Sequence, residues 1–268
     1  MRILVTGAAT GIGRATTVEL SARGHEVVAT ARRLEALDGL DAGGRLVLDV
    51  TDERSVARAV AEAGPLDGIV NNAGLSEPGP IEEYPADAWR RVMDTNVLGP
   101  MLVSRELIPA MRAQGHGVIV NISSVQGRLG IPFGGAYCAS KHALEGFSEV
   151  LRYEIGHFGI RVVLIEPGYI ASGPTQDAGR ARITHGEDLE VYRELHDQWD
   201  GTDDQVVGSG GRPGPEVVAV AVADAIEDPA TPFRVRVGAD SEMVLAARSS
   251  LDDETFESTM RGVLGLTW

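Results

Sequence analysis

The sequence predicts an α/β fold, a doubly wound sheet of about seven parallel strands with helices on both faces. Three observations predict it. Short apolar runs alternate with segments of helical periodicity along the 268-residue chain. The runs are apolar nearly throughout, which is typical of parallel strands covered on both faces. A glycine-rich turn separates the first run from the first helical segment, at residues 7–13.

Each element follows from local composition. Short β-prone apolar runs predict strands at 3–6, 26–30, 45–50, 66–71, 117–122, 160–166 and 233–237. Apolar residues at helical spacing predict helices at 11–23, 52–63, 87–113 and 136–158. Gly24 is expected to end the first helix, and Thr51 or Asp52 to cap the second. The sequence leaves open whether the tail, 251–268, is ordered.

The whole chain, 1–268, is predicted to form a single nucleotide-binding domain. Its 43% hydrophobic and 24% charged residues are an ordinary globular balance. Composition shifts only at about 172–215, a polar, acidic segment with a glycine-rich end. Because ligands of such sheets bind at the carboxyl edge, this insertion after the sixth strand is predicted to be a substrate lid.

Charge and cysteine content exclude several classes of protein. A net charge of −15 disfavours binding to nucleic acid or to an anionic membrane surface. No run of 18 apolar residues is present, and only a short apolar run precedes Gly7, so neither a membrane-spanning helix nor a signal peptide is expected. The single cysteine, Cys138, cannot form an intrachain disulfide, so a reducing compartment and a cytoplasmic location are expected.

The first loop carries glycines at 7, 11 and 13, in the pattern G-x-x-x-G-x-G. Gly7 permits the tight turn, Gly11 lets the backbone approach a pyrophosphate, and Gly13 lets the helix pack on the strand. The helix N-terminus offers amide donors and a favourable dipole to the anion. We therefore predict a dinucleotide site at this loop, with Thr10 and Ile12 among its contacts.

The end of the second strand bears on the choice of cofactor. Arg32 and Arg33 stand there, and no acidic residue is present to bind a ribose 2′-hydroxyl. Guanidinium groups suit a 2′-phosphate, which favours NADP(H) and leaves NAD(H) possible. Asp49, at the end of the third strand, is the expected acceptor for the adenine amino group, with Val50 beside it.

Tyr137 and Lys141 are spaced to share one helix face, about one turn apart. A lysine cation about 5 Å away would lower the pKa of the phenol by roughly two units, toward the working pH of an acid or base. Ser124 follows the fifth strand, at the same carboxyl edge of the sheet. The Ser124 hydroxyl can donate a hydrogen bond to a substrate carbonyl oxygen that lies beside the Tyr137 hydroxyl.

These motifs together resemble the short-chain dehydrogenase/reductase family, in its compact single-domain members with a Rossmann-like fold. From residue 2 to about 172, the family's order and spacing are matched by Thr6-Gly7-x-x-x-Gly11-Ile12-Gly13, Asn71-Asn72-Ala73-Gly74, Thr95-Asn96-Val97, Ser124, Tyr137-x-x-x-Lys141 and Pro167-Gly168. Each motif is weak or moderate alone, whereas the set is very specific.

The resemblance implies a role for each matching residue. Tyr137 would be the general acid in reduction and the base in oxidation, while Lys141 would hold the nicotinamide ribose and lower the pKa of the phenol. Ser124 would polarise the carbonyl, and Asn96 would bend its helix and hold a water of the proton relay. Further cofactor contacts would come from Asn72, Ala73, Gly74, Tyr137, Pro167, Gly168 and Ile170.

Two positions depart from the family pattern. Ser172 stands where the family often has threonine, and its hydroxyl can serve the same contact. Thr10 stands where many NADP-preferring members carry a basic residue, so the preference for NADP(H) depends on Arg32 and Arg33.

The substrate is predicted less sharply than the chemistry. The expected reaction interconverts a small-molecule ketone or aldehyde with its alcohol, on a lipophilic or polycyclic substrate. Phe133 and Tyr169 are the predicted substrate contacts beside Ser124 and Tyr137. Other apolar candidates are Leu75, Pro78, Ile131, Tyr192, Leu195 and Trp199. The six histidines show no metal-ligand spacing, so no metal is predicted.

Other functions stay open at this point. An NAD-dependent alcohol dehydrogenase and a non-catalytic NADP-binding regulator are the alternatives, although a regulator has no need of the proton-transfer residues. A hydrolase lacks its G-x-S-x-G turn, and a sugar-nucleotide epimerase or dehydratase would need a longer C-terminal domain. A homodimer or homotetramer is expected through the two long helices, with Ala143, Leu144, Phe147, Val150 and Leu151 as a candidate face.

Overall fold

The computed structural model describes residues 1–171, 191–200 and 211–267. Seven parallel strands form one sheet, in the order β3-β2-β1-β4-β5-β6-β7. Their bounds are β1 Arg2–Val5, β2 Glu26–Ala31, β3 Gly44–Val47, β4 Gly68–Asn71, β5 Gly117–Ile122, β6 Ile160–Pro167 and β7 Arg234–Val237. The chain winds outward from β1 in one direction and then, from β4, in the other. The predicted doubly wound fold is confirmed.

The reversal of strand order places the ligand site. β1 pairs with β2 on one side and with β4 on the other. In open sheets of this kind, ligands bind at the carboxyl ends of the strands where the order reverses. The loops that follow β1, β4, β5 and β6 therefore converge at one edge.

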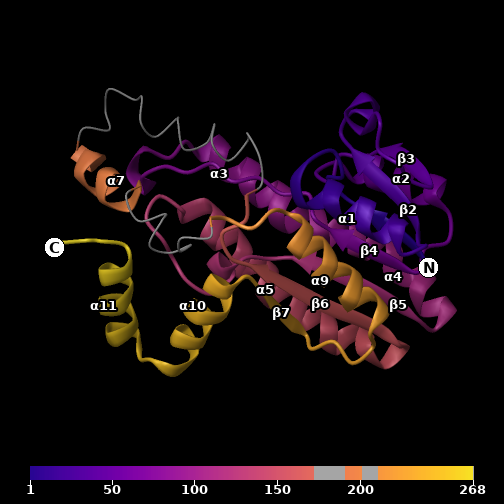
Figure 1. Cartoon of the computed structure of the whole chain (residues 1–268). Helices are drawn as coiled ribbons and strands as arrows, with labels where there is room; N and C mark the ends of the chain where they lie inside the picture. Colours follow the sequence, from indigo (N-terminus) through magenta and orange to yellow (C-terminus); the bar gives the residue numbers. More distant parts are fainter. Residues whose placement is uncertain (172–190, 201–210, 268) are drawn as a thin grey trace.

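Helices cover both faces of the sheet (Figure 1). The main helices are α1 Gly11–Ala22, α2 Glu53–Ala63, α3 Ala86–Met93, α4 Gly99–Gln114, α5 Gly135–Ile155, α7 Arg193–Asp200, α9 Glu216–Glu227, α10 Ala239–Ser250 and α11 Asp253–Val263. Successive residues of a strand point to opposite faces. Ile3 therefore packs in the cluster that contains residues of α1 and α9, and Leu4 in the cluster with α2, α4 and α5.

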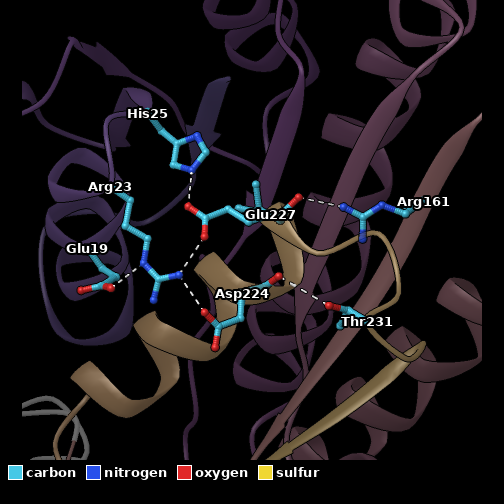
Figure 2. A network of polar contacts seen from close by, with 8 residues as sticks. Glu19, Arg23, His25, Arg161, Asp224, Glu227 and Thr231 are labelled. Atoms are coloured by element: carbon cyan, nitrogen blue, oxygen red, sulfur yellow. Dashed lines mark hydrogen bonds and ion pairs between the residues drawn. The ribbon is translucent and has the colours of Figure 1, made fainter.

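A polar network joins α1 to α9 (Figure 2). Arg23, just after α1, donates to Glu19 of its own helix at 2.7 Å and to Asp224 and Glu227 of α9 at 2.7 and 2.9 Å. Arg161 of β6 donates to the carbonyl oxygens of Ala225 and Ile226, at the carboxyl end of α9. The helix that follows the glycine loop is thus fixed to a neighbour far along the chain.

Three predicted boundaries need correction. The helix expected over 87–113 is three segments, α3, a π-helical turn at Asp94–Leu98, and α4. The strand expected over 45–50 ends at Val47, because Asp49 accepts hydrogen bonds from Thr51 and turns the chain toward α2. The helix expected over 136–158 ends at Ile155 and continues as one 3₁₀ turn, Gly156–Phe158.

Four helices that follow β6 in the described part of the chain, α7, α9, α10 and α11, have no counterpart among the predicted elements. The tail left open by the sequence contains α11, whose Phe256 is buried against Val125 and Leu245. Most of the predicted lid, 172–215, lies outside the described residues. Among the helices that the structure describes, none is long and apolar enough to cross a lipid bilayer.

Candidate active site

The loop after β1 has the backbone shape that its glycines predict. Gly7 and Gly11 adopt φ angles of +66° and +53°, in the left-handed region that side chains disfavour. A Cβ at Gly13 would lie 2.3 Å from the Gly7 carbonyl oxygen and 2.4 Å from Asn72 Nδ2. Only glycine therefore fits where α1 crosses the end of β1.

The N-terminus of α1 is open for an anion. Its N-cap residue, Thr10, is extended and makes no side-chain capping bond, and no acidic residue lies in the first turn. The first amide groups of a helix have no partner within the helix, so these donors suit a pyrophosphate. Ile12 is half-buried and packs against the hydrophobic core beneath the loop. The loop fits the dinucleotide predicted for it.

Residues after β4 hold the glycine loop from the side. Asn72 donates through Nδ2 to the carbonyl oxygens of Thr6 and Gly7, at 2.9 and 3.1 Å. The Thr6 hydroxyl accepts from the amides of Asn72 and Ala73 in return. Both of these side-chain hydrogen bonds of Asn72 therefore go to the glycine loop. Gly74 lies close to Asn96, since a Cβ at Gly74 would lie 3.3 Å from Asn96 Oδ1.

The residues predicted to distinguish NADP(H) from NAD(H) and to bind adenine lie just after β2 and β3. Arg32 and Arg33 directly follow β2 and are exposed, and neither guanidinium makes a hydrogen bond or ion pair with another described residue. Asp49 uses one carboxylate oxygen for Thr51, which leaves the other for a ligand. Val50 is buried against Gly99, where a Cβ would lie 2.8 Å from its Cγ2. Two uncompensated guanidinium groups suit a phosphate.

Ser124, Tyr137 and Lys141 are brought together at the carboxyl end of β5. Ser124 follows the strand, and its hydroxyl is hydrogen-bonded to that of Tyr137, in the first turn of α5. Lys141 lies one turn further along α5. Its Nζ donates to the Ile122 carbonyl oxygen at 2.7 Å and stands 5.4 Å from the Tyr137 ring centre. The arrangement can present two hydroxyl groups to one carbonyl oxygen.

Burial sets the ionisation of this group. It raises the pKa of Tyr137 to about 12, and the hydrogen bond from Ser124 opposes that rise only in part. It lowers the pKa of Lys141 to about 8, with the negative charge of Glu145 acting in the opposite direction. The expected lowering of the tyrosine pKa is wrong for this structure, because desolvation of the phenolate has a larger effect on the pKa than the hydrogen bond with Ser124.

Asn96 lies in the π-helical turn and is almost fully buried. Its side chain exchanges two hydrogen bonds with the backbone of Leu75, both at 2.9 Å, and donates to Ser140 Oγ at 3.0 Å. Ser140 in turn donates to the Tyr137 carbonyl oxygen at 2.7 Å. Asn96 therefore joins the loop after β4 to the helix that carries Tyr137.

The loop after β6 is held by an acid from α10. Asp240 accepts from the Tyr169 amide at 2.6 Å, and a Cβ at Gly168 would lie 2.1 Å from its carboxylate. Pro167 ends the strand and Ile170 is buried. Pro167, Gly168 and Ile170 therefore form a rigid turn at the predicted nicotinamide end of the site.

The two predicted substrate contacts lie in different surroundings. Phe133 is buried against Leu264 and Tyr192, and its φ of +59° is unusual for a residue with a side chain. Tyr169 is half-buried, with the Arg212 guanidinium 5.4 Å from its ring centre. Leu195 joins the Phe133 cluster, whereas the side chain of Trp199 lies outside the described part of the chain. Cys138 is buried, and its thiol contacts Gln126.

Ser140, Asp240 and Glu145 support the site and were missed by the sequence analysis. The helical spacing of Ser140 and Glu145 relative to Tyr137 and Lys141 was the available signal, since residues three or four apart share a face. Nothing local marks Asp240, which contacts a residue 71 positions earlier.

Comparisons with known proteins agree with this geometry. Residues 1–182 match the family model of the short chain dehydrogenases. A 3-ketodihydrosphingosine reductase of Bacteroides thetaiotaomicron is 33% identical over 97% of this chain and 96% of its own length. Human retinol dehydrogenase 5 is 39% identical over 70% of this chain and 59% of its own length.

Solved structures give the same picture. A short-chain dehydrogenase from Streptomyces avermitilis superposes with a TM-score of 0.74 at 32% identity, covering 97% of each chain. One from Burkholderia cenocepacia, in complex with NADP, superposes with a TM-score of 0.77 at 25% identity, over 100% of this chain and 98% of that one. The protein is thus an oxidoreductase that belongs to the short-chain dehydrogenase/reductase family.

Proposed function

We propose that the protein is an NADP(H)-dependent carbonyl reductase that converts a lipophilic ketone or aldehyde to its alcohol. The convergence of Ser124, Tyr137 and Lys141 beside the glycine loop is the observation that supports this reaction. Bound NADPH would supply the hydride. The residues of the chain would bind the dinucleotide, orient the carbonyl and deliver the proton.

Each part of the site has one task in this reaction. The amides at the start of α1 bind the pyrophosphate, and Lys141 holds the nicotinamide ribose. Ser124 orients the carbonyl oxygen by donating a hydrogen bond, and Tyr137 gives its proton to that oxygen as negative charge develops there. With its pKa raised to about 12, Tyr137 keeps its proton at neutral pH, which favours the reductive direction.

The preference for NADP(H) is supported by Arg32 and Arg33, whose charges have no partner among the described residues. A related structure from Burkholderia cenocepacia holds NADP. Thr10, which is not basic, is the observation that favours the alternative, an NAD-dependent alcohol dehydrogenase.

The substrate class is supported by the names of two relatives, and Phe133 and Tyr169 are its proposed apolar contacts. Two similar proteins are named for 3-ketodihydrosphingosine and retinol, and both names denote lipophilic molecules. Phe133 and Tyr169 would contribute apolar surface for such a molecule. If Phe133→Ala and Tyr169→Ala leave kcat/KM for the true substrate unchanged, this pocket assignment is wrong.

The first experiment is a cofactor titration by calorimetry with NADPH and with NADH. Wild type, Arg32→Ala and Arg33→Ala are compared with Arg105→Ala, which removes an exposed arginine of α4 that pairs with Glu53. NADPH should bind more tightly than NADH to the wild type. Loss of a charge-assisted phosphate contact should weaken NADPH binding about tenfold or more in the first two variants, and leave the control unchanged.

Other outcomes of the titration have definite meanings. Equal or tighter binding of NADH would show that Arg32 and Arg33 are solvated bystanders and would favour the alcohol dehydrogenase. Tight NADPH binding with no turnover across a panel of lipophilic ketones and aldehydes would favour the non-catalytic regulator.

A further inference from the structure

Glu145 is a buried charge next to the candidate active site. It lies on α5, one helical turn after Lys141, and is 5% exposed. Buried carboxylates are costly unless they are hydrogen-bonded and paired. The proposed reaction assigns tasks to Ser124, Tyr137 and Lys141 but none to this buried acid, so the role of Glu145 is unexplained.

One oxygen of Glu145 holds the chain that carries Ser124. Oε1 accepts a hydrogen bond of 2.5 Å from Ser123 Oγ, and Ser123 is 2% exposed. Gly127 packs on this pair, because a Cβ there would lie 2.7 Å from Ser123 Oγ and 3.0 Å from Glu145 Cγ. The contact therefore fixes the residue directly before Ser124 against α5.

The other oxygen of Glu145 binds Arg234 of β7. Oε2 accepts from Arg234 Nε at 2.9 Å, and the same guanidinium binds Glu149 at 2.6 Å. Arg234 Nε also lies 3.4 Å from Glu166 Oε1, at the end of β6, and Arg128 reaches that oxygen at 3.9 Å. Arg234 thus pairs with three carboxylates, two on α5 and one on β6.

Solvent reaches this network from the far side. Glu166, Arg128 and Arg234 line a surface cavity of about 400 Å³, together with Arg236 and Glu242. Glu145 is not among the lining residues. Arg234 therefore separates Glu145 from the cavity, and the charge of Glu145 acts in a poorly solvated region, where Coulomb interactions are stronger than in water.

On the basis of the proposed function, we propose that Glu145 is a positioning residue of the active site. Its carboxylate holds Ser123, and with it the turn that presents Ser124, and its negative charge stabilises the buried Lys141 ammonium one helical turn away. Lys141 faces Tyr137 and Glu145 on its own helix and the Ile122 carbonyl on β5. Among these groups, Glu145 is the one carboxylate. This inference agrees with the direction in which Glu145 acts on the pKa of Lys141.

The test compares Glu145→Gln with Glu149→Gln. Glutamine keeps the shape of Glu145 and an acceptor for Ser123 but removes the charge. Glu149 lies one turn further along α5, binds the same arginine and is half-exposed, so its variant is a matched control. Thermal melting, NADPH binding and the pH profile of kcat for carbonyl reduction are measured from pH 6 to 10.

Loss of the charge at Glu145 should favour neutral Lys141. We expect the alkaline limb of kcat and of NADPH affinity to move about one unit to lower pH, with kcat near pH 8 lower by roughly fivefold. KM for the carbonyl should change little, and Glu149→Gln should keep the wild-type profile. If Glu145→Gln unfolds cooperatively and the alkaline limb of its kcat profile lies at the same pH as in the wild type, the proposal is overturned.

A second variant, Arg234→Gln, tests the same role if Glu145→Gln does not fold. Arg234→Gln removes the cation that neutralises Glu145, so the alkaline limb should move to higher pH, the opposite direction. A limb that stays in place or moves down in Arg234→Gln would contradict the role of Glu145. The proposed function is tested separately by Tyr137→Phe, because reduction that survives in that variant contradicts the function itself.

Discussion

Tyr137 keeps its proton in this fold because protein, rather than water, surrounds its hydroxyl group. Burial raises the pKa of the phenol to about 12 and lowers the pKa of Lys141 to about 8. The two groups therefore remain protonated together up to about pH 8. A phenol hydrogen-bonded to Ser124 is then an acid aimed at the oxygen that both hydroxyl groups would contact.

Replacing Tyr137 tests this reading directly. Tyr137→Phe should lower kcat for carbonyl reduction by about 10²–10⁴-fold, the usual contribution of a positioned acid. NADPH affinity should change little, because the phenylalanine ring keeps the packing of α5. Steady-state kinetics and calorimetry measure the two effects. A loss in NADPH affinity as large as the loss in kcat would place Tyr137 in cofactor binding instead.

Glu166 gives a prediction about stability. Burial and the neighbouring charge of Glu145 raise its pKa, against the attraction of Arg128 and Arg234. An acid whose pKa is higher in the folded than in the unfolded state does not affect the free energy of unfolding at a pH below both pKa values. As the pH rises from the unfolded-state pKa to the folded-state pKa, this acid lowers the free energy of unfolding, and the loss is complete above the folded-state pKa.

Glu166→Gln should therefore become more favourable, relative to wild type, as pH rises from about 5 to 8. The free energy of unfolding by urea measures the difference at each pH. Glu242→Gln is the control, since Glu242 lines the same cavity but is exposed and pairs with Arg236. A difference that shrinks as pH rises would mean that the arginines dominate the ionisation of Glu166.

At the scale of elements, the glycine loop lets the start of α1 pack directly on the end of β1, with no room for a side chain at Gly13. In Gly13→Ala, the new methyl group would meet the Gly7 carbonyl and the Asn72 amide well inside contact distance. We expect a loss of about 3 kcal/mol in the free energy of unfolding, as for an overpacked core, together with weaker NADPH binding.

A second glycine provides the control. Gly262 in α11 has no atom within 4 Å of a new Cβ, so Gly262→Ala should be neutral or stabilising by about 0.5 kcal/mol. Urea denaturation of the two variants compares them. Equal stabilities would mean that α1 can move away from β1 at no cost, and that the loop is not held as tightly as its contacts indicate.

Element by element, the sequence predicts the sheet better than the helices that cover it. Most strands are short apolar runs, and that pattern is local; β3 and β7, which contain arginine, are the exceptions. The helix expected over 87–113 hides a π-helical turn, because the contacts of Asn96 with Leu75 and Ser140 that accompany it come from distant segments. In α9, alternating valines and alanines obscure the helical period, and its burial against α1 becomes evident only in three dimensions.

The same distinction applies to the site. Ser124, Tyr137 and Lys141 could be located from strand ends and helical spacing, which are properties of neighbouring residues. Asp240 and Arg234 could not, since their partners lie 71 and 89 positions away in the chain. The direction of the Tyr137 pKa shift was also out of reach, because it depends on how much water the fold excludes.

For the whole molecule, the surface of α5 bears on assembly. The candidate oligomer face requires correction, because Leu144 and Leu151 are buried within the subunit. Val150 and Tyr153, by contrast, are 56% and 83% exposed. They lie three positions apart and share one side of the helix. We propose that this side of α5, rather than the whole predicted set, contacts a second copy of the chain.

Sedimentation of wild type at micromolar concentration should therefore show a dimer or tetramer. A Val150→Glu and Tyr153→Glu double variant should lower the mass, because placing carboxylates in an apolar contact between two copies of an already acidic chain is costly. Val220→Glu is the control, since Val220 is 41% exposed on α9, away from α5. A wild-type monomer would contradict the assembly itself. An unchanged mass in the double variant would instead move the contact to another surface, and equal dissociation in the control would point to a general effect of added charge.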